Sequence, residues 1–426
     1  MKEDFLHYLW QHQKLMVYYL QTIRGDNIYI FDPGTPNQNS GPDFFNARIK
    51  IGDQIWAGNV EIHVKSSDWF VHHHENDSSY DNVILHVVWE HDVPVFRKDN
   101  TELATMEIKD KVPPYTLENY YKLFNTDQQW INCDKDFPEV DSFKLNNWLE
   151  RLFIERLERK SLALQKMLQR SNNNWEAVLF KLLAKNFGLK INAEAFLSVA
   201  NSFDFSVVRK TRRSDIALEA LLLGQAGLLE VDIEEPYLKM LQKEYAFLKI
   251  KFKLDATSVL PIKFFRLRPS SFPTIRLSQL GHLYHQQPQL FNKLIKADRL
   301  NDIYQILGSK TSTFWETHYT FNKTSKRTTK KLSKSFINLL IINTLIPLKF
   351  CYAAHQGNDV NDDIIDLVSQ LPPEQNTIIT KFNTLKKVSH TALHSQALLQ
   401  LRNEYCVKNQ CLKCVVGNAI IASQNF

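Results

Sequence analysis

Residues 41–65, GPDFFNARIKIGDQIWAGNVEIHVK, decide the fold of the first part of the chain. Two stretches rich in β-branched and aromatic residues, 44–51 and 54–65, flank Gly52-Asp53, and such a dipeptide favours a tight turn between antiparallel strands. From residue 60 to residue 65 apolar and polar side chains alternate, so the two kinds face opposite sides of a strand. The stretch therefore predicts a β-hairpin.

The residues around this hairpin predict a small α/β domain. A short strand is expected at 28–31, and the run NVILHVVW at 82–89 is nearly all apolar, as in a central strand. Residues 3–23 carry apolar side chains near helical spacing, which predicts an amphipathic helix. We expect a mixed sheet flanked by helices to fill residues 1–130.

Near residue 142 the apolar residues change to a helical period. Helices are expected at 142–164, 175–187, 193–203, 215–229 and 235–252. Further helical patterns continue to about residue 400. We therefore predict a second domain, 142–426, that is large, mainly α-helical and ends in a cluster of cysteines.

The composition favours a soluble protein of the cytoplasm. The chain has 426 residues, of which 44% are hydrophobic, enough for a sizeable core and for two or three domains. Its start lacks the apolar stretch of a signal peptide, and its longest apolar run, 336–350, is interrupted by Asn338, Asn343 and Pro347. That run is typical of a buried helix, so no membrane partner is expected. Five cysteines, an odd number, do not indicate a disulfide framework.

Asp43 and Glu61 form the candidate catalytic site. Asp43 stands at the head of the first hairpin strand and Glu61 lies on the second, so pairing brings the two carboxylates side by side. Converging carboxylates are typical ligands of Mg²⁺ or Mn²⁺, which activate water and neutralise a phosphodiester. His63 and Lys65 share the face of Glu61 and would position the water. The alternative is a solvent-facing strand with ordinary charges.

Residues 1–130 resemble the PD-(D/E)XK nuclease superfamily. Pro42-Asp43 matches its PD element, Glu61 matches the acidic residue of its second element, and Glu3 is a candidate for the acidic residue on its first helix. The resemblance implies a restriction-endonuclease-like fold and metal-dependent cleavage of DNA. The chain departs from the pattern at the lysine, because His63 stands where the superfamily has it and Lys65 follows one alternation later. The alternative is a non-catalytic nucleic-acid-binding or scaffold protein that retains this fold.

A second resemblance spans nearly the whole chain. It is carried by GPDFFNARI, GNVEIHVKSSDW, YDNVILHVVWEHD, EALLLGQAGLL, RLRPSSFPTIRLSQL and YCVKNQCLKC. Through these segments the chain is similar to a bacterial family catalogued as domain of unknown function 2851. This resemblance implies no particular activity.

Histidines concentrate in residues 72–77, HHHEND. A zinc site is one interpretation. Adjacent histidines on one segment cannot all point at one metal, which weighs against it. His86 lies within the apolar strand and is interpreted as a core residue.

Cys406, Cys411 and Cys414 have the spacing C-x4-C-x2-C and indicate a metal site. A tetrahedral site needs a fourth ligand, for which Cys133 is the candidate and His394 the reserve. Zinc and an iron–sulfur cluster are both compatible with four thiolates. The alternative is a group of free intracellular thiols.

Two basic clusters are candidates for contact with nucleic acid. Residues 317–358 contain no acidic residue, and a second group of cations lies at 209–213. Such patches favour binding to a phosphate backbone, with DNA expected in preference to RNA, although solvated surface charges are the alternative. The candidate residues are Arg209, Lys210, Arg212, Arg213, Lys326, Arg327, Lys330 and Lys331.

Overall fold

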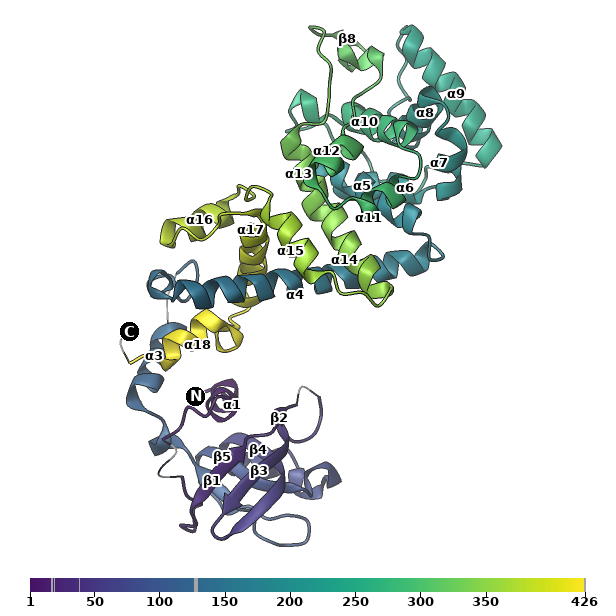
Figure 1. Cartoon of the computed structure of the whole chain (residues 1–426). Coiled ribbons are helices and arrows are strands. Elements are labelled where there is room, and N and C mark those ends of the chain that lie inside the picture. Colours follow the sequence, from purple (N-terminus) through teal and green to yellow (C-terminus); the bar gives the residue numbers. More distant parts are fainter. Residues whose placement is uncertain (17, 19, 38, 126–128, 425–426) are drawn as a thin grey trace. The chain divides into compact units, whose positions relative to one another are not determined.

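The computed structural model describes residues 1–16, 18, 20–37, 39–125 and 129–424 and divides into two compact units (Figure 1). Unit 1 comprises Met1–Trp148, Lys381–Lys386 and Gln400–Phe426, and unit 2 comprises Leu149–Thr380 and Lys387–Leu399. The C-terminal cysteine segment thus belongs to the first unit, whereas the sequence pattern placed all of 142–426 in the helical domain.

Unit 1 contains the sheet and the helices that cover it. Its elements are α1 (Glu3–Gln11), β1 (Ile28–Asp32), β2 (Thr35–Pro36), β3 (Phe44–Ile51), β4 (Gln54–Lys65), α2 (Asp68–Val71), η2 (His74–Asn76), η3 (Ser78–Tyr80), β5 (Val83–Glu90), β6 (Thr105–Glu107), η4 (Lys109–Lys111), α3 (Pro114–Phe124), η5 (Phe137–Glu139), η9 (Leu401–Cys406), η10 (Cys411–Lys413) and α18 (Val415–Ala422).

The sheet has the strand order β1-β3-β4-β5-β6, with β2 paired to β3. β3 and β4 form the predicted antiparallel hairpin, in which Ile51 pairs with Gln54. β4 runs parallel to β5, and β5 runs parallel to β6. The prediction of an α/β domain with a mixed sheet is confirmed, and the strand that carries Glu61 lies inside the sheet.

Residues 3–23 do not form one helix, because α1 ends at Gln11. Gln13 has a φ of 50°, and a right-handed helix cannot continue through that conformation. The helix that does form packs against β4, and its Phe5 side chain is fully buried. Phe5 also stacks on Tyr120 of α3, with ring centroids 3.9 Å apart. This contact joins α1 to α3.

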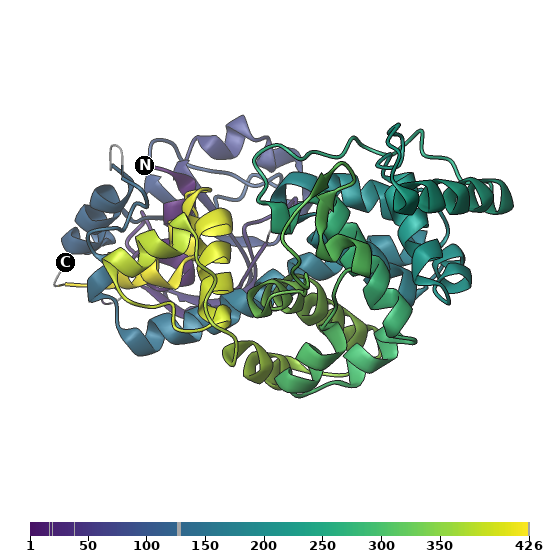
Figure 2. The same cartoon turned by 90° about the horizontal axis from the view of Figure 1, so that it is seen from above.

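The last helix of the chain, α18, lies beside α3 in both ribbon views (Figures 1 and 2). The buried side-chain amide of Asn119 in α3 donates to the carbonyl oxygens of Ile420 at 3.1 Å and Ser423 at 2.8 Å. One side chain of α3 therefore binds two carbonyls at the C-terminal end of α18.

Unit 2 is built almost wholly of helices. Its elements, together with the three helices that cross the boundary between the units (α4, α16 and α17), are α4 (Ser142–Arg170), α5 (Trp175–Phe187), α6 (Leu189–Asn201), α7 (Phe205–Thr211), α8 (Asp215–Gln225), α9 (Pro236–Phe252), η6 (Pro269–Ser271), α10 (Pro273–Gln286), α11 (Leu290–Lys296), α12 (Leu300–Leu307), η7 (Thr313–Glu316), β7 (His318–Thr320), β8 (Lys323–Thr324), α13 (Lys334–Leu340), η8 (Ile341–Leu345), α14 (Ile346–His355), α15 (Asn361–Ser369), α16 (Thr377–Leu385) and α17 (Ala392–Gln400).

The prediction of a mainly helical body is confirmed. α5 has the predicted bounds, and α6, α8 and α9 differ from theirs by a few residues. Every described residue between 142 and 250 is outside any strand. The small hairpin of β7 and β8 was not predicted.

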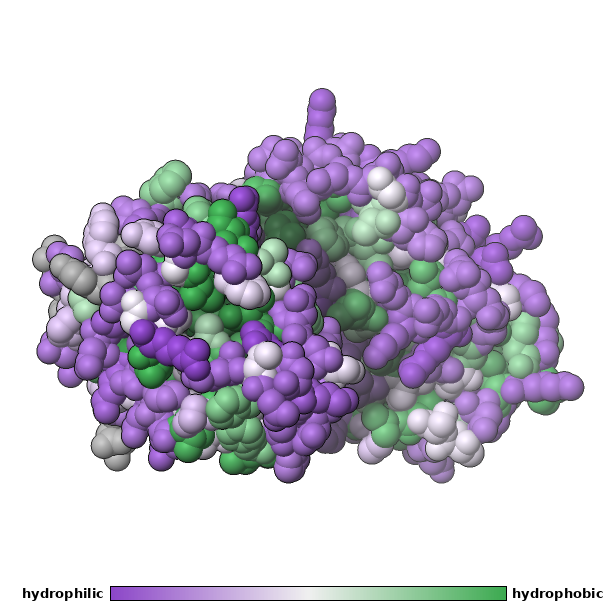
Figure 3. All heavy atoms as spheres, turned by 90° about the horizontal axis from the view of Figure 1, so that it is seen from below, coloured by the Kyte–Doolittle hydropathy of each residue, from purple (hydrophilic) through white to green (hydrophobic). Residues whose placement is uncertain are grey.

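One segment among the described residues, Lys334–His355, is long and apolar enough to cross a membrane. Its most apolar window is 72% buried inside the fold. Such burial is typical of the core helix of a soluble protein, and it agrees with the interpretation of the 336–350 run. Hydrophilic side chains cover most of the face shown in Figure 3, with smaller hydrophobic patches between them.

Candidate metal centre

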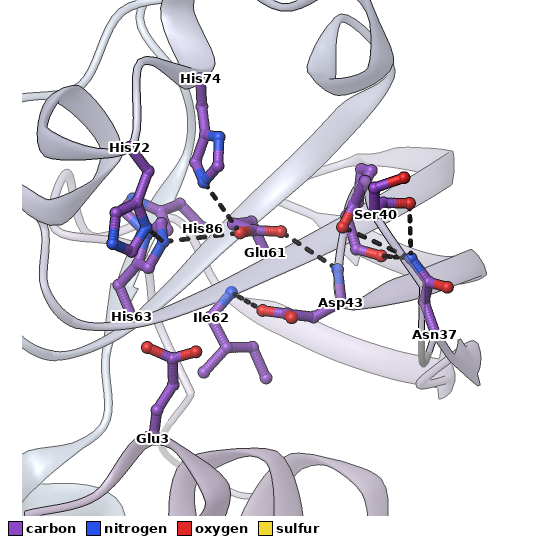
Figure 4. Close-up of polar contacts among 12 residues, drawn as sticks. Glu3, Asn37, Ser40, Asp43, Glu61, Ile62, His63, His72, His74 and His86 are labelled. Carbon is purple, nitrogen blue, oxygen red and sulfur yellow. Dashed lines mark hydrogen bonds and ion pairs between the residues drawn. The ribbon is translucent and has the colours of Figure 1, made fainter.

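Asp43 and Glu61 meet through the backbone of the hairpin (Figure 4). The Asp43 N–H donates to Glu61 Oε2 at 3.1 Å, and the Ile62 N–H donates to Asp43 Oδ2 at 2.9 Å. β3 has an irregularity between Phe44 and Ala47, and such a bulge re-aims the chain beside it. Only 6% of the Glu61 side chain is exposed, which excludes the solvent-facing strand as an explanation.

Helix α1 brings a carboxylate and an imidazole to the same place. Glu3 and His7 are four residues apart and share one helix face. His7 Nε2 lies 3.3 Å from Asp43 Oδ2 and 3.7 Å from Glu3 Oε1. One ligand atom from each of Glu3, His7 and Asp43 lies within 4.8 Å of the other two. The sequence indicated Glu3 but missed His7, whose only signal is its helical spacing from Glu3.

Three histidines form a second group beside Glu61. His63 lies on β4, His72 follows α2, and His74 begins η2. One nitrogen from each lies within 4.8 Å of the other two. Glu61 Oε1 is 3.5 Å from His63 Nε2 and 3.3 Å from His74 Nε2 (Figure 4). The Glu61 carboxylate therefore lies between the nitrogen-rich group and the group around Asp43.

His73 explains how two neighbours in the run of three histidines face the same site. Its φ of 59° is left-handed, and its own side chain is 80% exposed. This reversal of the backbone leaves His72 and His74 on one side and His73 on the other. The three adjacent histidines therefore do not all point to one place, as expected, but His72 and His74 converge with His63.

His86 supports His63 from the neighbouring strand. It pairs with Glu61 across β4 and β5, and it is fully buried, as predicted for a core residue. His63 Nδ1 lies 2.9 Å from His86 Nε2. If that Nδ1 carries the proton, His63 Nε2 keeps a lone pair for a ligand, an arrangement common behind metal-binding histidines.

Burial at this site opposes the charged form of several side chains. Burial, and then the charge of Asp43, raise the pKa of the Glu61 carboxyl. Burial, and then His74 and His72, lower the pKa of His63 to about 3, so this imidazole is neutral. Among the described residues, His7 Nε2 and His74 Nε2 are buried without a partner in hydrogen-bond geometry. The neutral His63 imidazole, the buried Glu61 carboxylate and the nearby oxygens of Glu3 and Asp43 are ligand types that fit a divalent cation.

Lys65 does not belong to this buried set. Glu61 and His63 are 4% and 1% exposed, but Lys65 is exposed at the end of β4. Its backbone N–H donates to Asp68 Oδ2 at 2.9 Å, where the chain turns into α2. Of the two residues expected to position water, the structure brings only His63 to the carboxylates, because β4 leaves the buried part of the sheet after it.

The family model described as Protein of unknown function (DUF2851) matches residues 3–377. The chain belongs to this family. No curated protein and no solved structure matches the chain. The match confirms the resemblance over residues 3–377, and membership of this DUF2851 family implies no particular activity.

Four cysteines of this DUF2851 protein line one cavity in unit 1. They are the predicted set, Cys133, Cys406, Cys411 and Cys414. Burial, and then the other three cysteines, raise the pKa of the Cys133 thiol, so the four sulfurs are close enough to interact electrostatically. His394, the reserve ligand, belongs to unit 2 and is not among the residues that line the cavity.

The predicted nucleic-acid-binding residues, all in unit 2, are not equally accessible. Lys330 is 7% exposed, and its amine donates to the Trp315 carbonyl and lies 4.2 Å from the centre of the Tyr319 ring. It therefore has a role inside the fold and is not available to phosphate. Arg327 pairs with Glu316 at 3.0 Å. The remaining six are at least partly exposed: Arg209, Lys210, Arg212, Arg213, Lys326 and Lys331.

Proposed function

We propose that this protein is a metal-dependent nuclease that cleaves phosphodiester bonds of DNA at the site around Asp43 and Glu61. The observation that carries the proposal is the convergence of Glu3, His7 and Asp43, from two separate elements, within 4.8 Å. Glu61, which accepts the Asp43 N–H, is buried, and a buried carboxylate without a compensating cation destabilises a fold, so a protein that keeps one at this place has a use for it. Asp43 and Glu61, with Glu3 as the candidate on the first helix, match the motif of the PD-(D/E)XK superfamily.

The ligand chemistry favours Mn²⁺ over Mg²⁺. Glu3, Asp43 and Glu61 offer oxygen, which both ions accept, but His7 offers nitrogen, which suits Mn²⁺ better. His63 and its two partners form a second, nitrogen-rich group on the other side of Glu61. Two adjacent ligand groups with a carboxylate between them fit a pair of ions, as in many enzymes that cleave phosphodiesters.

The roles of the residues follow from their positions. When bound, the ions would lower the pKa of a water molecule and neutralise charge on the phosphodiester. Asp43 and Glu61 would hold the ions, and the Ile62 N–H fixes the Asp43 carboxylate. His63 is neutral and cannot supply the positive charge of the superfamily lysine, but its Nε2 can bind metal or accept a proton from water.

The substrate proposal also includes the surface of unit 2. The exposed cations Arg209, Lys210 and Arg213 would contact the DNA backbone. We place the activity in the cytoplasm, because all five cysteines are free thiols, as in proteins of a reducing compartment.

A second candidate function is non-catalytic binding of nucleic acid. It is favoured by one observation, the exposure of Lys65 away from the buried carboxylates. A protein that has lost the superfamily lysine from its site can keep the fold and the binding surface without cleavage.

Cleavage assays distinguish the two functions. Full-length protein is incubated with plasmid, linear duplex, single-stranded DNA and RNA, in Mn²⁺, in Mg²⁺ or in EDTA. We expect cleavage of DNA that is fastest in Mn²⁺ and absent in EDTA. Asp43→Asn and Glu61→Gln should each lower the rate by about 100-fold or more, equivalent to about 2.7 kcal/mol or more of transition-state stabilisation.

Lys65→Ala is the matched control on the same strand. Because Lys65 is outside the buried set, this variant should cleave within about threefold of wild type, less than 1 kcal/mol. Circular dichroism should show that all the variants are folded. DNA binding by wild type without cleavage in any divalent ion would contradict the nuclease proposal and favour the non-catalytic function.

A further inference from the structure

Four of the five cysteines meet in one cavity, although unit 2 separates them in the sequence. Cys133 precedes α4, and the other three lie between η9 and α18. The rest of the lining is mostly apolar and includes Leu123, Ile131, Phe137, Leu401 and Val416. All four are free thiols, so no disulfide accounts for their convergence.

The backbone around Cys411 and Cys414 is shaped to present two sulfurs. The Cys414 N–H donates to the Cys411 carbonyl at 3.2 Å, which closes a tight turn. A Cβ on Gly417 would lie 2.1 Å from that same carbonyl oxygen, so only glycine permits the first turn of α18 to approach it. The glycine at 417 therefore serves the geometry of the cysteine turn.

Hydrogen-bond donors point at the sulfurs. The side-chain amide of Asn132 donates to Cys411 Sγ at 3.6 Å. The backbone N–H groups of Val416 and Gly417, at the start of α18, hydrogen-bond Cys414. N–H donors stabilise a sulfur that carries negative charge, as a metal-bound thiolate does. Such donors also adjust the properties of the metal that the thiolate binds.

The spacing of the sulfurs distinguishes a cluster from a single ion. Four thiolates around one zinc, each about 2.3 Å from it, lie about 3.8 Å apart. In the part of the chain that the structure describes, no three cysteine sulfurs all lie within 4.8 Å of one another. An iron–sulfur cluster holds its cysteines farther apart than one ion does, because the sulfurs bind different irons.

We propose that Cys133, Cys406, Cys411 and Cys414 bind an iron–sulfur cluster that fixes the C-terminal segment to unit 1. The cluster has a structural effect on the candidate metal centre, because η10, which carries Cys411, packs against α1. α1 supplies Glu3 and His7, and it also stacks on α3, against which α18 packs. The cluster thus helps to hold the helix that completes the ligand set.

Metal and sulfide analysis tests this proposal without any assay of cleavage, so its outcome is independent of the proposed nuclease activity. Full-length protein is purified without oxygen, and iron, zinc and acid-labile sulfide are measured with the visible spectrum. We expect iron and sulfide in equal amounts, at least two of each per chain, and broad visible absorption that dithionite bleaches. One zinc per chain without iron, or protein without either metal, overturns the proposal.

Serine variants identify the ligands. Cys133→Ser, Cys406→Ser, Cys411→Ser and Cys414→Ser should each lose most of the iron, whereas Cys351→Ser, at a buried thiol of unit 2, should retain it. If the Cys133→Ser variant retained its iron, Cys133 would not be a ligand of the cluster. Should serine variants misfold, limited proteolysis of wild type before and after removal of iron replaces them, with new cleavage expected between residues 400 and 424. Unchanged proteolysis would contradict the structural role.

Discussion

Glu61 contacts both ligand groups of the candidate metal centre. Its Oε1 faces the nitrogens of His63 and His74, while its Oε2 accepts the Asp43 N–H. Carboxylates can bind two cations through their two oxygens, and a dinuclear site places such ions about 3.5–4 Å apart. The position of Glu61 therefore predicts that its two neighbouring ligand groups are occupied together.

His74→Ala should remove one of two bound Mn²⁺ ions per chain. His74 is one of three nitrogens in its group, and losing a ligand or its support lowers metal affinity by about 10-fold or more. Equilibrium dialysis with Mn²⁺, followed by elemental analysis, counts the ions. The Asp43 group keeps its own ligands, so one ion should remain.

His73→Ala is the control from the adjacent position. The His73 side chain is 80% exposed, so its loss should leave both ions bound. Equal loss of Mn²⁺ in the two variants would show that the histidine segment acts through its general charge and not through the directed nitrogen of His74.

Among single site residues, the sequence predicted those whose positions follow from the alternation of side chains along a strand. Asp43, Glu61 and His63 follow from the hairpin, whose strands have a period of two. His7 and His74 depend on how α1 packs against β4 and on the left-handed backbone of His73. No periodic pattern in the sequence reports helix packing or a single left-handed residue. Sequence reasoning therefore missed His7 and gave too little weight to His74.

At the scale of elements, the buried Glu219 of α8 joins four segments of unit 2. Its Oε1 accepts from Trp315 Nε1 at 2.5 Å and from the Tyr237 hydroxyl at 2.9 Å, and its Oε2 accepts from the Ser278 hydroxyl at 2.7 Å. These donors come from η7, α9 and α10. One carboxylate therefore satisfies two fully buried donors and the half-buried Tyr237 hydroxyl, and it fixes how the helices pack.

Glu219→Ala should destabilise unit 2 by about 3 kcal/mol or more, because it leaves buried donors unpaired and a cavity beside them. Glu219→Gln keeps the shape and an acceptor for Trp315, and its amide can donate to Ser278 Oγ, so we expect a loss below about 1.5 kcal/mol. Urea unfolding at neutral pH measures both. Similar losses in the two variants would mean that side-chain volume, and not the hydrogen bonds, decides the effect.

The same residue predicts a pH dependence. Burial raises the pKa of Glu219 above its ordinary value of 4.5, against the opposing hydrogen bonds from Trp315, Ser278 and Tyr237. Folding thus favours the protonated form, whose stabilisation is complete below pH 4.5 and is lost as the pH rises through the folded-state pKa. The stability of wild type relative to Glu219→Gln should therefore fall with rising pH in unfolding series from pH 4.5 to 8. A constant difference would contradict the raised pKa.

Elements were predicted where one period persists over many residues. β3 and β4 have the predicted bounds because Gly52-Asp53 marks the turn between them, and α5 has them because its helical pattern is unbroken. α1 was predicted too long, because the apolar spacing continues past Gln13 while the backbone does not. Lys330 was interpreted as a surface cation because a charge pattern does not report burial by a distant Trp315.

At the scale of the whole molecule, the two compact units do not follow the order of the sequence. The helical period gives no sign that residues 400–426 return to the first unit. The cysteines did carry that information, since three of them near the end of the chain need a fourth partner. Spacing of metal-type ligands therefore predicted a long-range contact that hydrophobic patterning left undetermined.

The exposed cations around the end of α7 predict how binding of DNA depends on salt. Arg209, Lys210 and Arg213 are exposed around the end of α7 and would each neutralise a phosphate. Replacing all three with alanine should weaken binding to duplex DNA and lower the slope of log K against log salt concentration by about 2 to 3, because each contact contributes about 0.9. Fluorescence anisotropy in EDTA, from 50 to about 200 mM salt, measures this slope without cleavage.

Alanine at the exposed Lys144, Lys166 and Lys296 removes as much charge elsewhere and should leave the slope nearly unchanged. Equal slopes in the two triple variants would show that net charge, and not a defined surface beside α7, attracts the DNA.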